Sequence, residues 1–292
     1  MIEEFLDYLQ YELNRSELTV KSYGDDLRAF ELYFKNLDNQ LSWESVDSDV
    51  IRDWMESMMD KGNNATSINR RLSALRSLYR FALIHHKVEK DPVHGIKGPK
   101  ESKPLPQFLK ESEMNELLDP VMWGAGYKDV SARTILLTFY ETGIRLSELT
   151  GLDDTAVDFA NRQLKVTGKR NKQRIIPFGE ELANALKDYM TLRDKSVVKK
   201  SEALFLTKNG ERMCGNQVRC EVKKNLSRVC TLKTRTPHVL RHTFATVMLN
   251  HNAGLESVKK LLGHESLSTT EVYTHTTFEQ LKRVYTNAHP RA

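Results

Sequence analysis

Apolar residues recur at intervals of three and four positions in four stretches near the start of the chain, at residues 5–13, 20–34, 50–58 and 68–83. This spacing places the apolar side chains on one face of an α-helix. Each stretch is therefore predicted to be an amphipathic helix. The short connections between the stretches favour a small four-helix bundle.

A proline-rich segment follows the predicted helices. Residues 92–107 contain half of the chain's eight prolines, together with Gly95 and Gly98. Proline lacks a backbone N–H, so such a segment can continue neither a helix nor a central strand. We predict an N-terminal helical domain at residues 1–91, a linker at residues 92–107 and a second domain at residues 108–292.

The second domain shows mixed patterns. The segments "ESEMNELL", "VSARTILLTFYETG" and "EELANALKDYMTLRD" have helical spacing, and so does the stretch from "TPHVLRHTFATVMLN" to a helix end near Gly263. The segment "RQLKVTGKRNKQRIIPF" is typical of two strands joined by a basic turn. The chain is thus predicted to be mainly α-helical with a small antiparallel β-sheet.

Composition excludes several classes of protein. The 292 residues are 39% hydrophobic and 28% charged, enough to bury a core, which excludes a disordered chain. No apolar run approaches the roughly 18 residues of a membrane helix, and the N-terminus lacks the features of a signal peptide, so we expect a cytoplasmic protein. The three cysteines form no CxxC pair and are expected to be free thiols.

The positive charge is concentrated on the fourth predicted helix. Between Asn64 and Lys87 there are five Arg or Lys residues and no Asp or Glu. An ordinary solvated face would mix both signs, so we interpret this helix as facing nucleic acid. Arg70, Arg76 and Arg80 are its candidate DNA contacts, with Lys97 from the linker as a fourth.

Two segments carry basic residues suited to binding an anion. In "TGIRLSELTGL", Arg145 precedes Glu148 by three positions, which also fits an ordinary ion pair across one helical turn. In "VTGKRNKQRIIP", Lys169 follows Gly168 in the predicted turn, with Lys172 close by. This pattern fits a solvated hairpin, or a phosphate site in which a flexible lysine delivers a charge or a proton.

Two further segments add histidine, arginine and tyrosine. In "TPHVLRHTFATVML", His238 and Arg241 lie three positions apart, so they share one helix face. A zinc pair made of His238 and His242 is disfavoured, because the glutamate of an HExxH motif is absent. In "LLGHESLSTTEVYTH", Tyr273 follows His264 by nine positions. Taken alone, Tyr273 also fits a structural tyrosine.

Taken together, these residues favour one kind of chemistry. Arginines bind phosphate oxygens in a bidentate manner, and no carboxylate cluster suggests a Mg²⁺ site. A tyrosine is neutral at pH 7 and needs a cationic pocket to act as a nucleophile. The set therefore indicates attack by a phenol on a phosphodiester without a metal ion.

The four segments resemble the tyrosine recombinase family, most closely its Xer-type members, and the resemblance covers nearly the whole chain. It implies a catalytic set made of Arg145, Lys169, His238, Arg241, His264 and Tyr273. It also implies that Glu148 orients Arg145 and that the N-terminal domain is a SAM-like helical domain that binds DNA. In such enzymes the tyrosine forms a 3′-phosphotyrosyl bond, and neither ATP, metal nor any other cofactor is needed.

The resemblance also implies an assembly and a role. The two domains of such enzymes form a C-shaped clamp on a double-stranded recombination site. Four protomers, identical or paired with a sister recombinase, exchange strands through a Holliday junction, and the C-terminal tail docks on a neighbouring protomer. The implied role is resolution of chromosome or plasmid dimers, which serves chromosome partition at cell division.

Three alternatives to this role remain open. They are an integrase of a mobile element, a type IB topoisomerase-like enzyme that relaxes DNA, and a DNA-binding module that cleaves nothing.

Overall fold

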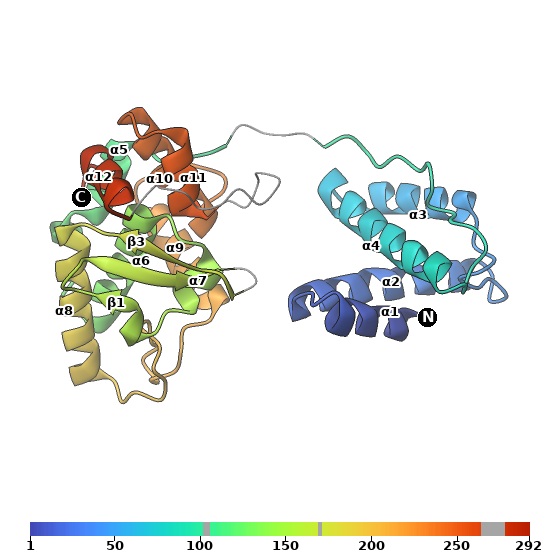
Figure 1. Ribbon diagram of the computed structural model, residues 1–292, viewed down its shortest axis with the longest axis horizontal. Helices are drawn as coiled ribbons and strands as arrows, with labels where there is room; N and C mark the ends of the chain where they lie inside the picture. The colour runs from blue at the N-terminus through green and yellow to red at the C-terminus, as the bar shows by residue number, and fades with distance from the viewer. Residues whose placement is uncertain (102–105, 169–170, 264–277) are drawn as a thin grey trace. The chain divides into compact units, whose positions relative to one another are not determined.

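The computed structural model describes residues 1–101, 106–168, 171–263 and 278–292 (Figure 1). The chain divides into two compact units, Met1–Pro104 and Leu105–Ala292. None of the helices in the described ranges combines the length and the apolar character that a membrane span would need.

The N-terminal unit is a bundle of four helices, which confirms the sequence prediction. They are α1 (Ile2–Asp7), which continues into a π-helical turn (Tyr8–Glu12), α2 (Glu17–Leu37), α3 (Ser48–Asp60) and α4 (Ala65–Ile84). Side chains of Ser16, Asp47 and Asn64 accept hydrogen bonds from backbone N–H groups at the starts of α2, α3 and α4. Aromatic rings of Phe30 and Trp54 meet in the core, with ring centroids 4.7 Å apart.

The first half of the proline-rich segment packs against the N-terminal unit. Val93 and Ile96 are buried in its core. The backbone carbonyl of Pro92 accepts a hydrogen bond from Ser48 Oγ at 2.8 Å, and that of Pro99 accepts one from Asn69 Nδ2 at 3.0 Å. Because two apolar residues lie between Pro92 and Pro99, this half of the segment has apolar surface to bury.

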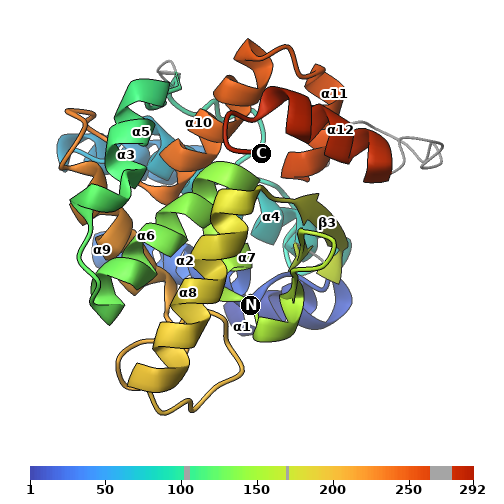
Figure 2. The same ribbon diagram turned by 90° about the vertical axis from the view of Figure 1, so that its left-hand side faces the viewer.

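The C-terminal unit is built around one central helix. Its described helices are α5 (Glu111–Leu118), α6 (Tyr127–Thr142), α7 (Leu146–Thr150), α8 (Glu180–Ser196), α9 (Gly215–Leu226), α10 (Pro237–Asn250), α11 (Leu255–Leu262) and α12 (Phe278–Ala288). Helix α6 contacts α5, α8, α9 and α10, and Figure 2 shows it running beside α8. Every residue from 134 to 142 of α6 is buried.

A small antiparallel sheet lies beside these helices. Its strands β1 (Val157–Asp158), β2 (Gln163–Thr167) and β3 (Gln173–Pro177) are arranged in sequence order. Leu164 of β2 lies opposite Ile176 of β3, and both are buried. The prediction of two strands joined by a basic turn is confirmed, and the two-residue strand β1 is an addition that the sequence pattern did not indicate.

The C-terminal helix α12 packs on its own chain, against α10, α11 and β3. Tyr285 is buried there, and its hydroxyl donates to Glu141 Oε2 at 3.2 Å. The backbone N–H of Gly179 donates to the same oxygen at 2.8 Å. Burial raises the pKa of Glu141 to about 8, against the opposing effect of these hydrogen bonds.

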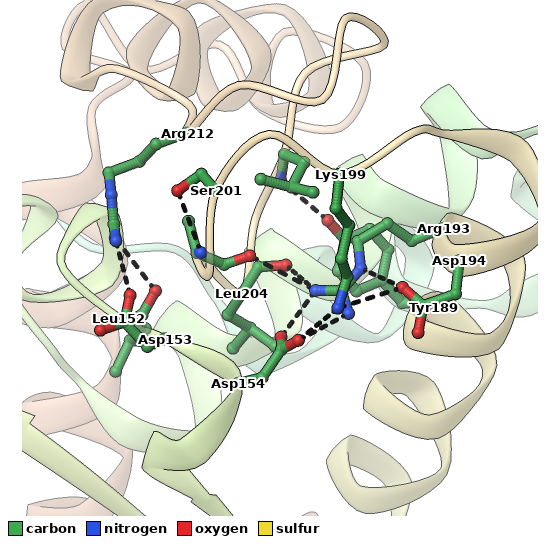
Figure 3. A network of polar contacts seen from close by, with 12 residues as sticks. Leu152, Asp153, Asp154, Tyr189, Arg193, Asp194, Lys199, Ser201, Leu204 and Arg212 are labelled. Carbon is green, nitrogen blue, oxygen red and sulfur yellow. Dashed lines mark hydrogen bonds and ion pairs between the residues drawn. The ribbon is translucent and has the colours of Figure 1, made fainter.

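A fully buried arginine near the end of α8 binds Asp154, in the turn before β1, and the segment that follows the helix (Figure 3). The Arg193 side chain is 0% exposed and binds both carboxylate oxygens of Asp154, at 2.7 and 2.9 Å. It also donates to Asp194 at 2.9 Å and to the backbone carbonyl of Leu204 at 2.7 Å. A buried charge is tolerated only when it is paired in this way.

Candidate active site

Arg145 and Glu148 form a hydrogen-bonded pair at the start of α7. Arg145 is the N-cap residue of α7, and its backbone N–H donates to Glu148 Oε2 at 2.7 Å. Its guanidinium donates through Nη1 to Glu148 Oε1 at 2.9 Å. The carboxylate therefore caps the helix and orients the arginine at the same time.

A second arginine shares this carboxylate. Arg174 of β3 donates through Nη1 to Glu148 Oε1 at 2.7 Å and through Nη2 to Oε2 at 2.9 Å. Burial of Glu148 on its own would raise the carboxyl pKa, but the hydrogen bonds from Arg174 and Arg145 outweigh it and lower the pKa to about 2. Glu148 is thus a permanent anion between two cations.

Arg241 of α10 completes a group of three arginines. Its Nη1 donates to the backbone carbonyl of Gly143 at 2.6 Å, and its Nη2 donates to that of Leu262 at 2.7 Å. Burial, with a smaller contribution from nearby Arg145, lowers the pKa of Arg241 to about 10, so the guanidinium stays charged at neutral pH.

The three arginines bind successive carbonyls at the end of α11. Arg174 Nε donates to Leu261 O at 2.9 Å, Arg241 to Leu262 O, and Arg145 Nη2 to Gly263 O at 2.9 Å. The last carbonyls of a helix lack partners within the helix and carry the negative end of its dipole, so they attract cations. The arginines thereby hold the residue that immediately precedes His264.

Gly143 allows the chain to turn sharply between α6 and α7. It has a left-handed backbone conformation, with φ of 59°. A Cβ atom at this position would lie 2.5 Å from Phe244 Cδ1 and 2.9 Å from Leu262 Cδ2. Only glycine fits both the turn and the close packing beside Arg241.

An open pocket of about 550 Å³ lies in front of Arg145 and Arg241. Its lining comprises Ile144, Arg145, Leu146, Ser147, Thr150, Gly215, Arg219, Thr236, Pro237, His238 and Arg241. The N-terminal residues of α9 and α10 are part of this lining, and helix N-termini favour anions. Because the described residues of the lining include three arginines and no carboxylate, the pocket suits a phosphate group.

Arg219 of α9 lines this pocket but was missed by the sequence analysis. Its Nη1 donates to Asn216 Oδ1 at 2.7 Å. The available signal was weak: an arginine in the first turns of a helix opposes the helix dipole, so it needs an anionic partner to be favoured there.

His238 lines the pocket from the first turn of α10. Its ring lies 4.5 Å from that of His242, one turn further along, in an edge-on arrangement. Within the described part of the chain, no group of three or more His, Cys, Asp or Glu residues could hold a metal ion.

The structure thus brings together Arg145, Glu148, His238 and Arg241. Lys169, His264 and Tyr273 lie outside the described residues. The residue before Lys169 is close to the site: a Cβ atom on Gly168 would lie 3.3 Å from Glu148 Oε1.

The candidate DNA contacts have mixed surroundings. Arg70 binds the carboxylate of Asp26 and the hydroxyl of Ser22, and Arg76 donates to the carbonyl of Ile96 at 2.7 Å. These two arginines therefore hold the N-terminal unit together as well as facing outward. Arg80, Lys97 and Lys172 are exposed.

Comparison with known proteins identifies relatives that match both units of the chain. Residues 107–280 match the model of the phage integrase family, and residues 2–86 match that of the phage integrase N-terminal SAM-like domain. The tyrosine recombinase XerC of Chlorobaculum tepidum is 36% identical over 99% of this chain and 94% of its own length. The tyrosine recombinase XerD of Staphylococcus haemolyticus is also 36% identical, over 100% of this chain and 99% of its own length.

A solved structure supports the fold. The XerH site-specific recombinase bound to palindromic difH substrate, in a post-cleavage complex, has a TM-score of 0.72 at 20% identity. The match covers 99% of this chain and 81% of that one. The matches in sequence span both units, and Arg145, Arg174 and Arg241 occupy the segments in which the family resemblance was found. The chain therefore belongs to the phage integrase family and is a tyrosine-type site-specific recombinase, an enzyme that cleaves and rejoins DNA strands.

Proposed function

We propose that Tyr273 is the nucleophile and that it attacks a DNA phosphodiester held in the pocket beside Arg145 and Arg241. Its oxygen forms a bond to phosphorus, and the 5′-oxygen of the next nucleotide leaves as a hydroxyl. The resulting 3′-phosphotyrosyl bond keeps the energy of the broken linkage. The 5′-hydroxyl of a partner strand then attacks this bond and restores the tyrosine, so no ATP is consumed.

The observation that supports this proposal most strongly is the cationic pocket. Arg145 and Arg241 line it together with the N-terminal residues of two helices, α9 and α10. Negative charge builds up on the non-bridging phosphate oxygens as the phosphorane forms, and fixed donors stabilise it without reorganising. Each such donor typically contributes about 10²- to 10³-fold in rate. The chain's own cations thus do what a metal ion does in other phosphoryl-transfer enzymes.

The remaining residues of the set transfer protons or donate a hydrogen bond. We assign to His238 the task of accepting the Tyr273 proton or positioning the phenol, because it lines the same pocket as the two arginines. We assign to Lys169 the proton that the leaving 5′-oxygen needs, and to His264 a hydrogen bond to a non-bridging oxygen. Both assignments rest on the family resemblance.

The DNA and the assembly follow from the same reasoning. We propose that Arg80, Lys97, Lys172 and Arg219, all exposed, contact phosphates of a double-stranded recombination site. Four protomers, identical or paired with a sister recombinase, would exchange strands through a Holliday junction. Helix α12 packs on its own chain, and exchanging it between protomers would preserve its contacts.

We propose that the role is resolution of chromosome or plasmid dimers. The full-length similarity to Xer recombinases supports it over integration of a mobile element. The relaxing activity of a topoisomerase-like enzyme would require no particular site, so a plasmid that lacks the recombination site serves as its test.

Covalent trapping tests the nucleophile. The full chain is used to select its site from random duplexes, and a nicked version of that site traps the intermediate. Wild type should form an adduct that resists detergent, with or without EDTA. Tyr273→Phe should bind the site without forming the adduct, whereas Tyr11→Phe, at a tyrosine that is 75% exposed in the N-terminal unit, should behave as wild type.

Either of two results would overturn part of the proposal. An adduct formed by Tyr273→Phe would show that another residue is the nucleophile. Loss of the wild-type adduct in EDTA would show that the reaction needs a metal ion.

A further inference from the structure

Arg174 occupies an unusual position for a residue of the basic hairpin. Its side chain is only 17% exposed, although it lies on a three-stranded sheet with many exposed positions. All three of its guanidinium nitrogens have partners: Nη1 and Nη2 bind the two oxygens of Glu148, and Nε binds the carbonyl of Leu261. It therefore joins β3, the start of α7 and the end of α11.

The four hydrogen bonds to Glu148 are divided evenly between two arginines. Each carboxylate oxygen accepts one bond from Arg174, and each accepts one from Arg145, by side chain at Oε1 and by backbone at Oε2. The Glu148 side chain is 1% exposed, so water cannot replace a missing partner.

This division determines which nitrogens of the Arg145 guanidinium are bound to Glu148 and how the guanidinium is oriented. Arg174 binds Glu148 end-on, through Nη1 and Nη2, and only Nη1 of the Arg145 guanidinium is bound to the carboxylate. Its Nη2 donates to Gly263 O, and the side chain remains 40% exposed along the pocket. Without Arg174, the Glu148 carboxylate would favour a bidentate pair with Arg145. Such a pair would turn the Arg145 guanidinium away from the phosphate.

We propose that Arg174 is a positioning residue for DNA cleavage, which holds Glu148 ionised and thereby keeps the Arg145 guanidinium directed into the phosphate pocket. This inference deepens the proposed function and rests on it. Arg174 does not line the pocket, so its effect passes through Glu148 rather than through contact with the substrate.

Loss of Arg174 has a definite electrostatic consequence. Burial raises the pKa of the Glu148 carboxyl, and the bonds from Arg174 are the largest effect that lowers it. Arg145 and, from α10, Arg241 are further charged groups that interact with Glu148. Without Arg174 the pKa should rise toward the neutral range, and Glu148 should gain a proton as the pH falls.

The first measurement follows this proton directly. Carboxyl carbons of glutamate are labelled with ¹³C in the full chain, and the Glu148 signal is assigned as the one missing in Glu148→Gln. In wild type the signal should not titrate above pH 4. In Arg174→Met it should titrate between pH 5 and pH 8. Arg174→Lys keeps a cation at the carboxylate and should keep it ionised, and Arg162→Met, at an exposed arginine just before β2, should match wild type.

The second measurement follows cleavage on the nicked site. Arg174→Met should form the covalent adduct about 10- to 100-fold more slowly than wild type at pH 8. This loss of rate is smaller than the loss of about 10²- to 10³-fold expected when a donor that contacts the phosphate is removed. The ratio of its rate to that of wild type should fall further as the pH is lowered to 5.5. In a Glu148→Gln background, Arg174→Met should cost less than about 3-fold, because the residue through which it acts is gone.

The two measurements separate the possible outcomes. A Glu148 signal in Arg174→Met that does not titrate between pH 5 and pH 8 would overturn the proposal, and so would a rate ratio that is independent of pH. A full additional loss in the Glu148→Gln background would also overturn it. If the wild-type chain forms no adduct at all, the proposed function fails, and the titration still decides whether Arg174 controls Glu148. If Arg174→Met does not fold, Arg174→Lys still decides: it should keep Glu148 ionised and cleave at close to the wild-type rate. The loss expected of Arg174→Met, found instead in a lysine variant whose Glu148 stays ionised, would overturn the proposal.

Discussion

Glu141 should make the C-terminal unit less stable as the pH rises. Burial raises its pKa to about 8 from an ordinary value of 4.5. Between these two values the folded protein binds a proton that the unfolded chain has released, so the free energy of unfolding falls as the pH increases. Glu141→Gln cannot ionise and should therefore be progressively more stable than wild type as the pH rises from about 5 to about 8.

The magnitude follows from the difference between the two pKa values. One pKa unit corresponds to about 1.4 kcal/mol, so the full difference is about 5 kcal/mol, reached above pH 8. The slope between the two pKa values should be about 1.4 kcal/mol per pH unit. In the described residues Glu141 Oε1 has no hydrogen-bond partner, so the amide of glutamine leaves an extra N–H unpaired. That costs about 1 to 3 kcal/mol at every pH and does not alter the slope.

Pulse proteolysis in urea measures the effect within the full chain. Peptides from residues 127–142 report the unfolding of the C-terminal unit, and the midpoint is compared at half-unit steps from pH 5 to pH 9. Glu116→Gln, at an exposed position in α5, is the matched control and should show no pH-dependent difference from wild type. A difference between Glu141→Gln and wild type that stays constant across this range would refute the reasoning.

Three further predictions concern the catalytic groups and the DNA contacts. Gly143→Ala should cost about 2 to 4 kcal/mol of stability through its left-handed backbone and overpacking, and should slow cleavage by displacing Arg241; an unchanged melting temperature would contradict this. Lys169→Ala should lose about 10²- to 10⁴-fold in cleavage and should recover on a substrate with sulfur at the leaving 5′ position, which needs no proton. Rescue of Lys172→Ala instead would show that the acid is the other lysine. Arg80→Ala should reduce the slope of log affinity against log salt by about one, and an unchanged slope would remove this residue from the DNA interface.

The parts of the fold that were predictable depend on local patterns. The bundle helices follow from apolar spacing, and the hairpin of β2 and β3 follows from two β-type runs on either side of a basic turn. Strand β1 was missed because two residues show no periodicity. The packing of Val93 and Ile96 was missed because proline content predicts where a helix ends, but does not predict which part of the protein the following residues contact.

The site was predictable as a set of residue types, and less so as a network. Arg145, Glu148, His238 and Arg241 stood out because of their spacing within short segments. Arg174 appeared in the sequence only as one of several cations in the hairpin. Its pairing with Glu148, 26 residues away in the chain, depends on the register of β3 against the rest of the unit, which no local pattern fixes.

The hydrogen bonds from the arginines to the carbonyls at the end of α11 have a thermodynamic consequence. Arg145 and Arg241 use the same guanidinium groups to bind its carbonyls and to line the pocket, so occupancy of the pocket and the geometry of this helix end are linked. Linkage is reciprocal: if a bound phosphate stabilises the observed position of α11 by some factor, displacement of α11 lowers the phosphate affinity by the same factor. Because α12 packs on α11, we expect a contact that displaces the C-terminal helix to shift this helix end, and with it the phosphate affinity of the pocket.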